Sequence, residues 1–441
     1  MSYRLTSRIR MRRSAKVIVI LFASVFLLIK CGEISNKKEG EKESVEFADF
    51  AGSQKCATCH KDIYATHIQT EHFLSTAPAT EENIAGSFEE GKNKLVFSDM
   101  AYVKMEKADT GLFQVEYIYD NRERKGRFDI TVGSGRKGQS YMSWAGNRLV
   151  QLPVTFFTPA GQWSTSPGYP GNKVVYNRPI TSRCLECHST YFHTTSLPDA
   201  KADEFDHNEI IYGIDCEKCH GPAAKHVEFQ TQHPEEKKGR YIVNPSSLSR
   251  QQNLDLCGLC HGGRLSKTKP SFSFQAGDSL ANYFKLNDNP MDAISIDVHG
   301  NQLGLLSVSK CFELSQMTCN SCHNTHKKEK DQLAVFSQRC TNCHSEGHEK
   351  ICKLTSAIGP AIQKNCIDCH MPKQASQSIA VNLKGTDTLT PVMMRTHWVK
   401  VYPGETEKLR RILNKEHGTQ NVEVQFKSNR PIQTKTQASH Q

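Results

Sequence analysis

The stretch Cys216-Glu-Lys-Cys219-His220-Gly-Pro-Ala-Ala-Lys-His226 decides how this chain can be built. Two cysteines three positions apart are followed directly by a histidine, and a second histidine comes six residues later. The pattern Cys-x-x-Cys-His occurs seven times in 441 residues and takes up 14 of the 17 cysteines. In chain order, motifs 1 to 7 are Cys56-Ala-Thr-Cys59-His60, Cys184-Leu-Glu-Cys187-His188, Cys216-Glu-Lys-Cys219-His220, Cys257-Gly-Leu-Cys260-His261, Cys319-Asn-Ser-Cys322-His323, Cys340-Thr-Asn-Cys343-His344 and Cys366-Ile-Asp-Cys369-His370.

Covalent attachment of haem explains this spacing. Two thiols on one helical turn can add to the two vinyl groups of one porphyrin edge, and the next histidine then reaches the iron as its proximal ligand. Zinc, the main alternative for paired cysteines, needs four ligands and gives no reason for a histidine after every pair. A thioredoxin-type redox pair predicts one or two copies within a βαβ pattern. We therefore expect seven covalent haem c groups, one for each motif.

The sixth coordination position of each iron decides between electron transfer and chemistry on a small molecule. Twelve histidines lie outside the motifs. The predicted distal ligands are His72, His226, His299, His326, His348 and His397. A histidine three or four residues after a proximal histidine cannot bind the opposite face of the same iron. We therefore expect His326 and His348 to bind neighbouring haems.

Other ligand assignments stay open. The reserve ligands are His67 and His193, and the histidines expected in solvent are His207, His233, His417 and His440. Methionines near the motifs could raise a reduction potential as ligands, although core packing is their more common use; they are Met317, Met371, Met393 and Met394. Cys311 and Cys352 could form a disulfide.

Residues 1–30 have the features of a signal peptide. They carry seven basic and no acidic residues, and a thirteen-residue apolar run, Val17–Ile29, follows the basic part. This run is short for a membrane span. Cys31 comes next and opens a polar tether over 31–50, so either a lipid anchor at Cys31 or a cysteine in a leader is possible. Both readings predict a periplasmic or membrane-anchored protein on the extracytoplasmic side.

The formal net charge of +10 does not predict nucleic-acid binding. Most of the excess lies in the leader, and the haem propionates would make the mature protein anionic. The expected partners are redox proteins, membrane-associated ones in particular, and the membrane surface if Cys31 is lipidated.

The rest of the chain divides into segments of different residue composition. We expect a first haem segment at 51–89, a β-rich insertion at 90–178, a six-haem domain at 179–400 and a polar tail at 401–441. The insertion alternates aromatic and β-branched residues and contains a predicted hairpin over 141–153. The six-haem part has too few apolar residues between motifs for a sheet, and the tail holds an amphipathic stretch, Glu405–Asn414. The predicted fold class is mainly α, with extensive loops wrapped on haems, plus the β-rich insertion.

Three segments resemble the cytochrome c-554 type domain of multihaem cytochromes: 52–72, 216–226 and 319–326. The stretch from Gly133 to Tyr169 is similar to an insertion in larger members, some of which also carry tetratricopeptide repeats, which this chain lacks. The resemblance implies packed haem pairs with largely bis-histidine ligation. Relatives of this kind include electron carriers and octahaem enzymes that oxidise hydroxylamine or reduce nitrite. This chain has seven motifs and no Cys-x-x-Cys-Lys motif, which favours the carriers.

The predicted function is electron transfer through mostly bis-histidine haems, with no catalytic residues assigned. The alternative is an oxidoreductase of small nitrogen or sulfur compounds, in which one haem keeps an open distal site. Residues that could line such a site are Tyr169, Arg183 and Arg264. The number of spare histidines favours the first function.

Overall fold

The computed structural model describes residues 44–196, 202–286, 293–329, 331–344, 352–358, 360–383 and 388–416. The leader, Cys31, His348, His417 and His440 lie outside these residues. The chain divides into a unit over Met1–Val45 and a unit over Glu46–Gln441, and the second unit carries every motif. Across the described ranges, no helix combines the length and apolarity needed to cross a bilayer.

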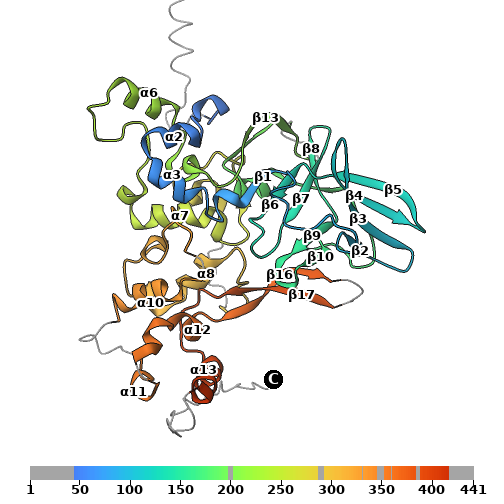
Figure 1. Ribbon diagram of the computed structural model, residues 1–441. Coiled ribbons are helices and arrows are strands. Elements are labelled where there is room, and N and C mark those ends of the chain that lie inside the picture. Colours follow the sequence, from blue (N-terminus) through green and yellow to red (C-terminus); the bar gives the residue numbers. More distant parts are fainter. Residues whose placement is uncertain are drawn as a thin grey trace, which may run out of the picture. The chain divides into compact units, whose positions relative to one another are not determined.

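Short helices carry most of the motifs (Figure 1). Those that contain or adjoin motifs 1, 2, 3, 4 and 7 are α2 (Ser53–Cys59), α4 (Ser182–His188), α5 (Cys216–His220), α7 (Arg250–His261) and α12 (Cys366–His370). Motif 5 begins in the 3₁₀ helix η6 (Cys319–Ser321), and α10 (Leu333–Thr341) ends in motif 6. Polar caps fix several of their starts: Asp215 caps α5, and Ser249 with Gln252 forms a capping box on α7.

The remaining helices connect these motifs. They are α3 (Lys61–His67), α6 (Ala224–Gln232), α8 (Gln302–Ser307), α9 (Lys310–Glu313), α11 (Thr355–Ile358) and α13 (Pro403–Glu416). The 3₁₀ turns are η1 (Phe47–Asp49), η2 (Phe73–Ser75), η3 (Thr158–Ala160), η4 (Pro245–Ser247), η5 (Leu280–Asn282) and η7 (Pro360–Lys364). The amphipathic stretch predicted over 405–414 is therefore helical, as the central part of α13.

Antiparallel sheets fill the long interval between motifs 1 and 2. One sheet has the order β2 (Lys94–Val96), β3 (Ala101–Ala108), β4 (Gly111–Ile118), β5 (Asn121–Arg127). A second has the order β1 (Thr76–Pro78), β6 (Ile130–Val132), β7 (Ser140–Ala145), β8 (Arg148–Gln151), β11 (Arg178–Pro179). A further pair joins β9 (Val154–Phe157) to β10 (Gln162–Thr165). The predicted hairpin over 141–153 is present as β7 and β8, which turn at Gly146.

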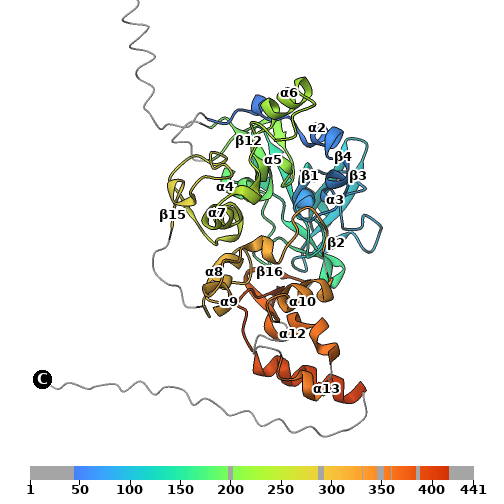
Figure 2. The same cartoon turned by 90° about the vertical axis from the view of Figure 1, so that its left-hand side faces the viewer.

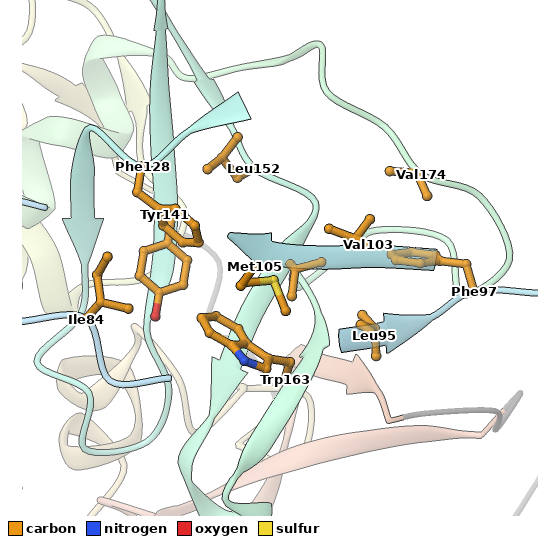
Figure 3. Packing of buried hydrophobic residues seen from close by; sticks show 11 residues of the cluster. Ile84, Leu95, Phe97, Val103, Met105, Phe128, Tyr141, Leu152, Trp163 and Val174 are labelled. Atoms are coloured by element: carbon orange, nitrogen blue, oxygen red, sulfur yellow. The ribbon is translucent and has the colours of Figure 1, made fainter. Parts of the chain in front are cut away.

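This β region, residues 76–179, has a hydrophobic core of its own. Figure 3 shows Tyr141, Phe128 and Trp163 packed together, with Met105 and Val103 beside them. The indole N–H of Trp163 donates to the carbonyl of Ser87 at 3.0 Å, so its polar atom is satisfied inside the cluster. The β region therefore has a core built from its own side chains.

The fold is mixed α and β, with short helices at the motifs and antiparallel sheets in the predicted insertion, and is less helical than the predicted mainly α fold. Hairpins also occur among motifs 2 to 7, where no sheet was expected. They are β12 (Tyr191–Thr194) with β13 (Phe205–Ile211), β14 (Ser266–Lys267) with β15 (Phe284–Lys285), and β16 (Lys373–Asn382) with β17 (Leu389–Arg395). The last hairpin buries Val381 and Val392 against Phe157 of β9, so its apolar partner comes from the distant β region.

Contacts between the β region and the rest of the chain include two sets of hydrogen bonds. The backbone N–H of Asn382 in β16 donates to the hydroxyl of Thr165 in β10 at 2.9 Å. At the other contact, the hydroxyls of Ser75 and Thr76 donate to the carbonyl of His188 in motif 2, at 2.7 and 3.0 Å. Figure 2 shows the helices as a column that runs from α6 and α2 at one end to α12 and α13 at the other.

Candidate haem-binding sites

Thiols of different motifs lie side by side. Within the described residues, hydrogen-bonded thiol pairs join motif 1 to 3, 2 to 4, 4 to 5 and 6 to 7: Cys56–Cys216, Cys187–Cys260, Cys257–Cys319 and Cys340–Cys366. The hydrogen bond from Cys340 is the main cause that lowers the pKa of Cys366, to about 6. The cysteines of these neighbouring motifs therefore lie near one another.

Weaker electrostatic contacts link the motifs that are not joined by hydrogen-bonded thiols. Cys219 of motif 3 acts on Cys257 of motif 4, and Cys343 of motif 6 acts on Cys322 of motif 5. The seven motifs therefore form one connected series, in the order 1, 3, 4, 5, 6, 7, with motif 2 joined to motif 4. Motif 4 is the junction of this series.

Three proximal histidines face a second imidazole. The ring centres are 6.0 Å apart for His220–His326, 6.2 Å for His72–His261 and 6.2 Å for His323–His397. Two imidazoles bound to opposite faces of one iron, with Fe–N bonds of about 2.0 Å, have ring centres roughly 6.3 Å apart. Each ring separation is therefore close to that of two imidazoles on one iron, and the residues present fit haem.

Burial keeps these imidazoles neutral. Desolvation is the main cause that lowers the pKa of His72 to about 4, and the neighbouring His261 adds to it. Burial likewise lowers the pKa of His397 to about 4 and that of His188 to about 4. A neutral imidazole offers a lone pair, which is the form that binds a metal.

Hydrogen bonds at Nδ1 orient several of the rings. The Nδ1 of His220 lies 2.9 Å from the carbonyl oxygen of Val243, and that of His261 lies 3.0 Å from Oε1 of Gln302. The Nδ1 of His370 is 3.0 Å from the carbonyl oxygen of Lys400. Such a partner fixes the tautomer and leaves Nε2 for the metal. These three proximal histidines are therefore already turned for iron.

The other predicted ligands are placed less completely. His299 lies close enough to His188 to act on it electrostatically. His226 on α6 has its Nδ1 2.8 Å from the carbonyl oxygen of Arg240, and it lies near His220. In the described part of the chain, no ring pair comparable to the three above involves His60, His344 or His370. His348 lies outside the described residues.

Carboxylates inside the motifs tie distant segments together, which the sequence reasoning missed. Glu217 of motif 3 accepts the backbone N–H groups of Ala51, Gly52 and Ala223, each at 2.8 Å. Burial raises the pKa of this carboxyl. Since any residue can occupy the two positions between the cysteines, the motif itself carries no sign of this role.

Acidic residues inside motifs 2 and 7 also bind neighbouring groups. Glu186 accepts from the guanidinium of Arg183 at 2.7 Å and from the backbone N–H of Phe272 at 2.8 Å. Asp368 accepts from the guanidinium of Arg395 at 2.6 Å. Arg183, one of the residues considered for lining an open haem, is therefore engaged in an ion pair.

Several other candidate residues have structural partners. The hydroxyl of Tyr169 donates to the carbonyl of Gln151 at 2.7 Å inside the β region. His207 stacks on Trp144 with ring centres 3.8 Å apart, and His193 lies beside Glu209, with Nδ1 2.5 Å from the carboxylate. Met394 packs against the buried cluster of Ile296, Val298 and Leu305, and Met393 is exposed. Four of these five residues therefore have structural partners.

Cys311 and Cys352 do not form a disulfide; both are free thiols. Cys311 lies near Cys322 and Cys343, between motifs 5 and 6. Cys352 lies near Cys369 of motif 7. Each therefore accompanies the attachment cysteines of a different part of the series.

Comparison with known proteins agrees with this site. The family model for cytochrome c554 and c-prime matches residues 171–221, which hold motifs 2 and 3. The multiheme cytochrome MtrA of Shewanella baltica (strain OS185) is 24% identical over 178 residues, which cover 37% of this chain and 52% of MtrA. The match thus spans about half the length of that relative. The crystal structure of outer cell wall cytochrome OcwA aligns with a TM-score of 0.49 and 17% identity, over 82% of this chain and 81% of OcwA.

The repeated haem-attachment motif, the facing imidazoles and these sequence matches define the class: the chain is a multihaem c-type cytochrome.

Proposed function

We propose that this protein conducts electrons through seven covalent haem c groups, outside the cytoplasm. The observation that supports the proposal is the connected series of motifs, in which four pairs of motifs are joined by hydrogen-bonded thiols and the others by weaker electrostatic contacts. Each haem, when bound, supplies one iron that takes up and releases a single electron. The polypeptide fixes where these irons stand and which ligands they have.

The proximal ligands in this proposal are the seven motif histidines. The ring pairs support His326 as the distal ligand of motif 3, His72 as that of motif 4 and His397 as that of motif 5. His326 thus serves a motif more than a hundred residues upstream, not the motif three residues before it. This agrees with the geometric limit on a ligand that follows its own proximal histidine so closely.

Two further assignments rest on neighbourhood. We assign His299 to motif 2 as the proposed distal ligand, because it acts electrostatically on His188. His226 is the distal ligand of motif 1, since α6 contacts η1 just ahead of α2, and its Nε2 is left unbound while Nδ1 is held. His348 remains the predicted ligand for a haem near the end of the series.

Electrons can enter or leave at three motifs that have an exposed attachment cysteine; two of them, motifs 1 and 2, are ends of the series, and the third, motif 6, adjoins its last member. Motifs 1, 2 and 6 each have one exposed attachment cysteine: Cys59, Cys184 and Cys343. An exposed porphyrin edge allows close approach of a partner, so we place the docking of redox proteins at these edges. A lipid at Cys31 would hold the protein at a membrane surface beside such partners.

Electron paramagnetic resonance of the oxidised holoprotein, together with its intact mass, tests the proposal. We expect a mass of the processed chain plus seven haems, and low-spin ferric signals from the assigned bis-histidine haems. A stoichiometric high-spin signal at one of the five assigned sites would contradict its ligand pair and favour the open-site oxidoreductase. Fractionation of cells, with labelled fatty acid to test Cys31, checks the location.

A further inference from the structure

His67 is a buried histidine that no haem assignment uses. It ends α3 and is 6% exposed. Its Nε2 lies 3.1 Å from the carbonyl oxygen of Ile214, and its Nδ1 lies 3.3 Å from that of Thr325. Because both ring nitrogens face carbonyl oxygens, neither has room for an iron. His67 is therefore not the reserve ligand that the sequence suggested.

The two carbonyls belong to segments that carry opposite ligands of one iron. Ile214 lies two residues before Cys216, which opens motif 3 and leads to His220. Thr325 directly precedes His326. The ring of His67 stands edge-on to that of His326, with centres 6.1 Å apart and planes at 69°. One side chain thus bridges both walls of the gap between His220 and His326.

The surroundings hold this bridge in place. The carbonyl of His67 accepts the hydroxyl of Thr70 at 2.7 Å, and its ring packs edge-on against Phe73 at 5.9 Å. The same turn leads on to His72, the facing partner of His261. A rotation of His67 would break contacts on both walls at once.

We propose that His67 is a positioning residue for the haem of motif 3. Its ring sets the separation and the mutual angle of His220 and His326, which are 6.0 Å and 19°. This inference rests on the proposed function, since it assumes that the two imidazoles share an iron. The groups acted on are the chain's own backbone carbonyls, so the role is separate from haem attachment.

Three variants test the role. His67→Phe keeps the ring and removes both nitrogens, whereas His67→Asn and His67→Gln each keep a donor near one of the two nitrogen positions. The matched control is His207→Phe, because His207 also contacts an aromatic ring and a carbonyl, but its partners Trp144 and Gly146 lie in the β region. Electron paramagnetic resonance of the oxidised holoproteins is the readout, and His326→Ala identifies the signal of the motif 3 haem.

We expect His67→Phe to shift the g values of that one signal, or to replace it by a high-spin signal, with the other signals and the intact mass unchanged. His67→Asn and His67→Gln should give smaller shifts of the same signal, and His207→Phe none. If His67→Phe yields no holoprotein, the Asn and Gln variants decide. If the His67 variants that mature give the wild-type spectrum, the role of His67 alone is overturned. If His326→Ala shows every low-spin signal of the wild-type protein, the ligand pair itself is overturned.

Discussion

The carboxylate of Glu217 in motif 3 accepts the backbone N–H of Gly52, the residue that precedes the helix of motif 1, at 2.8 Å. The same side chain accepts from Ala223, the N-cap of the helix that holds His226. Three parts of the proposed site around motif 1 are therefore joined through one buried carboxylate. We expect loss of this carboxylate to lower the stability of the protein more readily than its haem content.

We predict that Glu217→Gln lowers the free energy of unfolding by about 1–3 kcal/mol, because an amide keeps only one acceptor oxygen and leaves a buried N–H group unpaired. Chemical denaturation of the holoprotein measures the change. Glu235→Gln is the control, since the side chain of Glu235 is 75% exposed and should give almost no effect. Equal midpoints for the two variants would contradict the prediction.

Gly213 permits the close approach of two chain segments. Its φ is +66°, and a Cβ there would lie 2.0 Å from the carbonyl oxygen of Phe73. Gly213→Ala should therefore destabilise the protein by roughly 2–5 kcal/mol, from the left-handed backbone and the clash together. Gly146→Ala is the matched control, with φ +64° and no atom within 4 Å of the added Cβ. Similar melting temperatures for the two variants would show that the clash is relieved without penalty.

Removal of a distal ligand should change spin state without loss of haem. His397→Ala opens one face of the iron bound by His323, so we expect one low-spin signal to become high-spin while the mass still shows seven haems. Added imidazole should restore the low-spin signal. His233→Ala, at an imidazole that is 47% exposed, should leave the spectrum unchanged. An unchanged spectrum in His397→Ala would remove the assignment to motif 5.

Haem count should follow the motif cysteines and ignore the two spare ones. Cys366→Ala combined with Cys369→Ala should lower the intact mass by one haem beyond the change in side chains, because both thioether bonds of motif 7 are lost. Cys311→Ala should retain all seven haems, although Cys311 lies near Cys322. Retention of seven haems in the double variant would show that motif 7 does not attach one.

The ion pair between Arg339 and Glu329 should make the stability of the protein depend on pH. Hydrogen bonding from Arg339 lowers the pKa of Glu329, which is 13% exposed and also accepts the N–H of Asn324 at 3.0 Å. A lowered carboxyl pKa stabilises the fold above the unfolded-state value, near about 4.3, and the contribution disappears as pH falls through the folded-state value. Arg339 also donates to the carbonyl of Cys322, so the pair holds motif 5 against α10.

We therefore expect Glu329→Gln to cost about 1–3 kcal/mol at pH 7 and much less below about pH 4, measured by thermal unfolding at both values. Glu90→Gln is the control, because Glu90 is 84% exposed in its pair with Lys104 and should show little change at either pH. A cost for Glu329→Gln that is the same at both pH values would refute the electrostatic origin.

The sequence predicts local features of this protein well and long-range ones poorly. The Cys-x-x-Cys-His pattern and the glycine turn at Gly146 depend on neighbours in the chain, so they could be read directly. The β16–β17 hairpin could not, because Val381 and Val392 find their apolar partner in Phe157, more than two hundred residues earlier.

The pairing of imidazoles across a gap likewise depends on residues that are far apart in the sequence. Nothing near His326 indicates that its ring lies opposite His220 and not opposite a later motif. The role of His67 was equally hidden, since its two carbonyl partners, Ile214 and Thr325, lie about 150 and 260 residues away in the chain. Residue types indicated the chemistry, and only the fold could pair them.

The touching thiols have a consequence for how the protein is made. Cys340 and Cys366 lie within hydrogen-bonding distance of each other, as do three other pairs drawn from different motifs. If the chain collapsed to this arrangement before porphyrin arrived, an oxidising compartment would convert such neighbours to cystines that join the wrong motifs. Maturation must therefore run in one direction, with each thioether formed on an open polypeptide and the final packing completed afterwards.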